Sequence, residues 1–181
     1  ISFSELSNWM ECPFRHKLIY IDKIGTFDVS PHLSFGTGVH DANENYLKTR
    51  IMDKTLAFKI IEKSWIDNAD KFTNGPFPSW AKNGFGKVDD WTAKADKILN
   101  DIPAYLEEEF PGWECFDAEE NLYESVPDQQ IKFKGFIDAI LKVKDKRGHT
   151  KYWILDWKTC GWGWDSEKQQ DFKTQLQLIL Y

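Results

Sequence analysis

The sequence predicts an α/β (α+β) fold, in which a mixed, mostly antiparallel sheet is flanked by helices. Residues 1–110 carry apolar side chains at helical spacing, whereas residues 111–181 contain three alternating apolar and polar runs before a terminal helix. The chain has 181 residues, of which 41% are hydrophobic, enough for one compact core. We therefore expect a single domain over residues 1–181, with a helical part followed by the sheet.

The helical part is expected to open with two short helices. Ser4 is predicted to cap the first, and Pro13 to begin the second, because its fixed φ suits a first helical turn. Longer helices are predicted at residues 33–50, 54–68 and 89–110. Gly36 and Gly38 lie inside one of them. Since glycine weakens a helix, we expect these two to permit close approach to the sheet or to a substrate.

A loop rich in aromatic residues is predicted at residues 70–88, where glycine and proline recur. Its Phe72, Phe77, Trp80 and Phe85 allow two interpretations. They pack against the core, or they form a surface on which flat ligands such as nucleic-acid bases stack. We place core packing first, because it is the commoner use of such residues.

Three strands are predicted at residues 113–126, 131–144 and 151–158, and a final helix from near Ser166. In the second strand the odd-numbered residues are mainly apolar, whereas the even-numbered ones include four lysines and Asp138. Because successive side chains point to opposite faces, one face of this strand belongs to the core and the other carries charge.

Two carboxylates are predicted to face each other across the second hairpin. If its turn centres on Arg147, Asp138 and Asp156 lie nine residues to either side and are paired. Opposed carboxylates at about 5 Å repel each other unless a cation lies between them. Hard oxygen ligands suit Mg²⁺ or Mn²⁺, and Lys158 projects beside the same site. The alternative is a solvated strand face with an incidental ion pair.

Two further residue pairs are spaced to share a helix face. His40 and Glu44 are four residues apart, so both could reach a metal ion from above the sheet, although a single helical histidine is commonly structural. Gln177 and Tyr181 have the same spacing in the terminal helix. They could orient a phosphate or the lysine, or simply form a polar helix edge.

Composition excludes several classes of protein. The 23 basic and 29 acidic residues give a net charge of −6, unlike a strongly basic nucleic-acid or membrane-surface protein. Residues 131–158 nevertheless carry eight lysines or arginines against three aspartates, a local +5. The sequence contains no run of about 20 apolar residues, so it predicts no membrane span. Three widely spaced cysteines exclude a zinc ribbon and predict a reduced, intracellular (cytoplasmic) protein.

Several short motifs occur in an order that resembles a known family. The motifs are Ser2-Phe3-Ser4-Glu5-Leu6, Cys12-Pro13-Phe14-Arg15, Tyr20-Ile21-Asp22, Gly36-Thr37-Gly38-Val39-His40, Gly135-Phe136-Ile137-Asp138, Ile154-Leu155-Asp156-Trp157-Lys158-Thr159 and Gln177-Leu178-Ile179-Leu180-Tyr181. In this order they resemble the RecB-like branch of the PD-(D/E)XK nuclease superfamily, which includes RecB and AddB nuclease domains, phage exonucleases and CRISPR-associated adaptation nucleases.

The resemblance implies a restriction-endonuclease-like core and a metal-dependent deoxyribonuclease, exonuclease rather than endonuclease. It implies one or two Mg²⁺ or Mn²⁺ ions held by His40, Asp138, Asp156 and the main-chain carbonyl of Trp157. Lys158 would be catalytic, and Gln177 and Tyr181 would form the accessory Q-x-x-x-Y motif. Glu44 is a further candidate, acting directly or through water. Arg15 and Thr159 are candidates for DNA contacts.

Some members of the branch hold an iron–sulfur cluster. Cys12 matches its first cysteine, but Cys115 and Cys160 lack the required spacing, so we do not expect a cluster. The alternatives are an iron–sulfur adaptation-type nuclease, a catalytically degenerate nucleic-acid-binding module, and a structural protein with incidental strand charges. The expected partners are DNA, as single strands or duplex ends, and recombination or repair proteins, with no membrane and a phage as one source.

Overall fold

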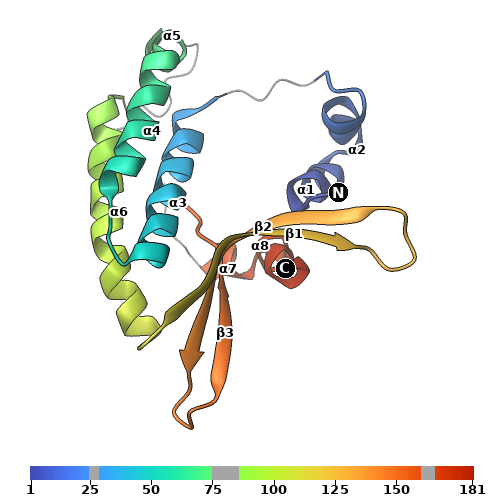
Figure 1. The fold of residues 1–181 in the computed structure, drawn as a ribbon. Helices are drawn as coiled ribbons and strands as arrows, with labels where there is room; N and C mark the ends of the chain where they lie inside the picture. The colour runs from blue at the N-terminus through green and yellow to red at the C-terminus, as the bar shows by residue number, and fades with distance from the viewer. Residues whose placement is uncertain (25–28, 75–85, 160–165) are drawn as a thin grey trace.

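The computed structural model describes residues 1–24, 29–74, 86–159 and 166–181. Over these residues the fold is α+β, as predicted, with helices beside a three-stranded antiparallel sheet of order β1-β2-β3. In Figure 1 helices α3, α4 and α6 lie together, and the β1–β2 pair extends away from them toward α1 and α8. Among the described helices, none is long and apolar enough to cross a bilayer.

The N-terminal helices begin as expected, with one correction. Helix α1 (Phe3–Glu11) is capped by Ser2, whose Oγ accepts a hydrogen bond from the Glu5 amide at 3.2 Å. Ser4, the predicted cap, therefore lies inside the first turn. Helix α2 (Pro13–His16) starts at its proline and continues into the π-helical turn η1 (Lys17–Ile21).

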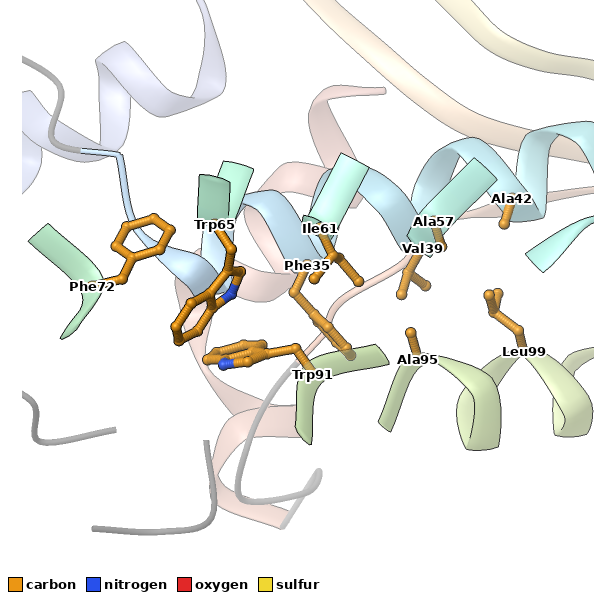
Figure 2. Packing of buried hydrophobic residues seen from close by; sticks show 10 residues of the cluster. All are labelled: Phe35, Val39, Ala42, Ala57, Ile61, Trp65, Phe72, Trp91, Ala95 and Leu99. Carbon is orange, nitrogen blue, oxygen red and sulfur yellow. The ribbon is translucent and has the colours of Figure 1, made fainter. Parts of the chain in front are cut away.

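Three long helices form one side of the molecule: α3 (Pro31–Thr49), α4 (Lys54–Asp67) and α6 (Val88–Glu109). All three were predicted to within two residues. Figure 2 shows their shared core, where apolar side chains from each helix meet. Its members are Phe35, Val39, Ala42, Ala57, Ile61, Trp65, Phe72, Trp91, Ala95 and Leu99.

The predicted loop at residues 70–88 is partly wrong, because α5 (Ala69–Asn74) makes its start helical. Phe72 is only 3% exposed and packs edge-on against Trp65 with ring centroids 5.3 Å apart. Because the ring of Phe72 is covered by the core, it offers no surface on which bases could stack. Phe77, Trp80 and Phe85 lie outside the described residues.

Gly38 is required by the packing of α3 on α4. A Cβ added there would lie 2.9 Å from the Ala57 carbonyl oxygen and 3.0 Å from the Ala57 Cα atom. Real Cβ atoms do not approach backbone this closely, so the helix axes could not stay at their present separation. The close approach expected at this glycine is therefore to a neighbouring helix rather than to the sheet or a substrate.

We expect Gly38→Ala to lower the free energy of unfolding by about 1–3 kcal/mol, because it overpacks the α3–α4 contact. Gly36→Ala is the matched control in the same helix. Its Cβ would meet only the Thr159 Oγ1 atom, at 3.4 Å, so better helix propensity should preserve or raise stability. Urea unfolding followed by circular dichroism measures both. Equal destabilisation by the two variants would contradict the explanation.

The sheet consists of β1 (Glu114–Ser125), β2 (Lys132–Lys144) and β3 (Thr150–Leu155). Ala139 pairs with Leu155 and Ile140 with Ile154, which confirms the register predicted for the second hairpin. The third strand was predicted to reach residue 158, but it ends at Leu155. The Trp157 amide donates instead to the Asp138 carboxylate, at 2.6 Å, which ends the ladder at that point.

The two faces of β2 have the predicted characters. Its odd-numbered Ala139, Leu141 and Val143 are buried in a second core cluster with residues of α3 and α6. Trp153 of β3 pairs with the buried Leu141, yet it is itself 51% exposed. Its ring lies at the margin of the cluster, 5.6 Å from the ring of Phe110.

The predicted final helix is divided into two. Helix α7 (Ser166–Gln170) begins at the expected residue, and α8 (Phe172–Leu180) follows it directly. Asp171 causes the division, because its carboxylate caps α8 by accepting from the Thr174 amide at 2.9 Å. This cap sets the direction of α8, which carries Gln177 and leads to Tyr181.

Candidate active site

Asp138 is the central residue of the site. It lies in β2, is 8% exposed, and its Oδ2 accepts from the Trp157 amide at 2.6 Å. Its Oδ1 lies 3.6 Å from the His40 Nδ1 atom. Burial raises the pKa of the Asp138 carboxyl, whereas His40 and the Trp157 amide act in the opposite direction. A buried carboxylate with one oxygen so weakly compensated favours a cation beside it.

His40 reaches the same point from α3 and contacts the main-chain carbonyl of Trp157, whose amide contacts Asp138. Its Nε2 donates to the Trp157 carbonyl oxygen at 2.9 Å. A carbonyl oxygen only accepts, so Nε2 carries a proton, and Nδ1 is the ring atom that faces the Asp138 carboxylate. A His40 ring that keeps its proton on Nε2 would share a cation with Asp138 through Nδ1.

Asp156 follows β3 directly and is held on both oxygens. Lys158 Nζ lies 2.5 Å from its Oδ2, and the Gln177 side-chain amide donates to its Oδ1 at 2.8 Å. The same amide nitrogen donates to the Tyr181 hydroxyl at 2.8 Å. The structure therefore brings the D-x-K residues and the Q-x-x-x-Y residues into one hydrogen-bonded chain.

Gly135 makes room for the last member of that chain. A Cβ at this position would lie 2.8 Å from the Tyr181 Cε1 atom, so the tyrosine ring rests directly on the β2 backbone. Burial raises the pKa of the Tyr181 hydroxyl, which keeps it protonated. Glycine in the middle of this strand thus has a packing role at the site.

Glu119 is a site residue that the sequence did not reveal. Ligand atoms of His40, Glu119 and Asp138 all lie within 4.8 Å of one another. Burial raises the pKa of the Glu119 carboxyl, as do the nearby carboxylates of Asp138 and Glu44. Imidazole and carboxylate donors at this spacing fit a divalent metal ion such as Mg²⁺ or Mn²⁺.

A backbone irregularity brings Glu119 to this position. The β1–β2 register shifts between Cys115 and Asp117, and one extra residue turns every later side chain of β1 to the opposite face. Glu119 itself has φ +60°, an uncommon value for glutamate. Alternation along β1 alone could not reveal either feature.

The remaining candidates lie near the site or away from it. Glu44 is paired with Lys48 at 2.5 Å and lies outside the three-residue cluster, although it lines the same pocket as His40. Thr159 lines that pocket too. Arg15 lies in α2, where it pairs with Glu11 at 2.5 Å, and lines neither pocket of the site.

The cysteines have local structural positions. The Cys12 Sγ atom accepts from the Arg15 amide at 3.4 Å and so caps α2. Cys115 lies in β1, where burial raises the pKa of its thiol. Both are free cysteines, and Cys160 lies outside the described residues.

Two pockets meet at Lys158. The first has a volume of about 910 Å³ and extends from Asp138 and Asp156 under the start of α1. The second has a volume of about 700 Å³ and lies between α3 and the residues that follow β3. The cationic side chain of Lys158 therefore faces two cavities that can admit a substrate.

Comparison with known families agrees with this geometry. The family model of the PD-(D/E)XK nuclease superfamily matches residues 1–181, the whole chain. The chain belongs to that superfamily. Membership indicates a metal-dependent nuclease, a hydrolase that acts on nucleic acid, and the fold is consistent with it. No curated protein and no solved structure matches the chain.

Proposed function

We propose that this superfamily member is a deoxyribonuclease of the RecB-like branch, and that it is an exonuclease. The observation that carries the proposal is the convergence of five residues from four parts of the chain, namely α3, β2, the segment that follows β3, and α8. They are His40, Asp138, Asp156, Lys158 and Gln177, and they are linked by the contacts described above. A basic β2–β3 region beside these carboxylates suits a polyanionic substrate.

The chain's own residues fit one or two Mg²⁺ or Mn²⁺ ions. Asp138, Glu119, His40, Asp156 and the Trp157 carbonyl would hold them, and the bound metal would activate water and stabilise charge on the phosphate. Glu119 is an addition to the ligand set expected from the motifs. Metal identity is part of the proposal, based on the hard oxygen donors.

Lys158 is assigned the catalytic cation. One of its three N–H donors is directed to Asp156, and the side chain is 40% exposed where the two pockets meet. The remaining donors can contact a phosphate oxygen or a water molecule. Gln177 is a positioning residue, since its side-chain amide donates to both Asp156 and Tyr181 and so holds the two together.

The decisive experiment compares end-labelled linear DNA with closed circular DNA in Mn²⁺ and in Mg²⁺, with EDTA as the control. An exonuclease releases label from linear DNA and leaves the circle intact. Cleavage of both substrates would overturn the exonuclease assignment and leave an endonuclease. Cleavage of neither would favour a nucleic-acid-binding module over an enzyme.

A further inference from the structure

The larger pocket has a second group of residues beside the carboxylates. Tyr123 of β1 and Phe136 and Lys134 of β2 line the same cavity as Asp138. Phe136 is 57% exposed and Tyr123 is 62% exposed. Large aromatic rings left in solvent beside a reactive site are available for contact with a ligand.

The sheet register places these side chains on one face. Phe136 pairs with Asn121, and Lys134 with Tyr123, directly across the β1–β2 ladder. Lys134, Phe136 and Asp138 alternate along β2, so they point the same way at intervals of about 7 Å. A cation, an aromatic ring and a metal-binding carboxylate thus follow one another in a line.

The charges along this line suit a phosphate backbone. Lys134 has no ion-pair partner for its ammonium group among the residues that the structure describes. Lys132 lies over the Tyr123 ring, with its Nζ atom 4.5 Å from the ring centroid. This cation–π contact orients the ring beside the pocket.

We infer that this part of the pocket is a subsite for single-stranded DNA. The base next to the scissile phosphate stacks on Phe136, Tyr123 extends the stacking surface, and Lys134 binds a backbone phosphate. A single strand is favoured because its bases present free π faces, whereas those of a duplex are already stacked. The inference rests on the proposed function, since it names the substrate form that the site receives.

Binding of a fluorescent ten-nucleotide oligo(dT) in EDTA tests the subsite without hydrolysis. Phe136→Ala should weaken binding at least about fivefold without changing its salt dependence, because stacking is lost but no charge. Lys134→Gln should reduce the slope of log K against log salt by about 0.7, the value for one phosphate contact on a single strand. Tyr105→Ala, which removes a ring 47% exposed on α6, is the matched control and should change neither quantity.

Three outcomes would overturn the inference. The first is that the unaltered protein does not bind oligo(dT). The second is that the affinity of Phe136→Ala for oligo(dT) stays within twofold of that of the unaltered protein. The third is that Phe136→Ala weakens the binding of single-stranded DNA and of blunt duplex DNA of the same length equally. The nuclease assignment is tested by a separate measurement, and absence of DNA cleavage in Mn²⁺ would refute it. A protein that binds oligo(dT) through Phe136 without cutting it would therefore support the subsite and refute the enzyme.

Discussion

Lys158→Ala should reduce DNA cleavage by about 10²–10³-fold while metal binding is retained. The expected loss is that of a positioned donor which stabilises charge developing in the transition state. Asp156 would lose its ion pair at 2.5 Å, but it keeps the Gln177 hydrogen bond and stays in place. Single-turnover cleavage of end-labelled DNA measures the effect.

The matched control for this substitution is Lys142→Ala. Lys142 also pairs with a carboxylate, Glu114 at 2.8 Å, but it lies outside both pockets of the site. Its removal should leave cleavage unchanged. The Mn²⁺-induced rise in Tm should persist in both variants, and full activity of Lys158→Ala would refute its catalytic assignment.

Asp138→Asn should stabilise the metal-free protein and abolish its response to metal. Burial raises the pKa of Asp138, so the folded state holds this proton more tightly than the unfolded state does. The free energy of unfolding therefore falls as pH rises from the ordinary aspartate pKa through the raised one, and the ionised carboxylate destabilises the fold at neutral pH. Removing the charge should raise Tm in EDTA at pH 7 by about 2–4 °C, or about 1 kcal/mol.

When metal is added, the unaltered protein should have a higher Tm than Asp138→Asn, the reverse of the order expected in EDTA. A ligand present at 100 times its Kd stabilises the folded state by about 2.7 kcal/mol, so saturating Mn²⁺ should raise the Tm of the unaltered protein by several degrees. Asp138→Asn should lose this rise, and Glu119→Gln should reduce it. Asp128→Asn, at an exposed turn with φ +59°, is the control and should behave like the unaltered protein. An undiminished rise in Asp138→Asn would exclude it as a ligand.

Much of the site was predictable because its residues lie in regular segments. Alternation along β2 placed Asp138 on the charged face, and symmetry about Arg147 gave the observed register of β2 and β3. Continued by one residue, that register places Asp156 opposite Asp138, even though the ladder itself ends at Leu155. Local periodicity and turn position thus determined the hairpin.

Glu119 shows why the rest could not be predicted. A one-residue bulge in β1 reverses the facing of all later side chains, and nothing in the local sequence marks where it occurs. The same limit applies to Glu44, whose spacing from His40 suggested a shared role but whose side chain pairs with Lys48. Spacing along a helix shows which residues share a face, and neighbours in space decide what each contacts.

The sequence by itself determined the three long helices, the three strands, the β2–β3 register and the set of motifs typical of the superfamily. These follow from side-chain periodicity, which is a local property of the chain. Only the tertiary structure decided that Glu119 joins His40 and Asp138, that Gly38 contacts α4, and that Gly135 supports Tyr181. Those contacts join residues far apart in the sequence, so their geometry exists only once the helices and the sheet have packed together.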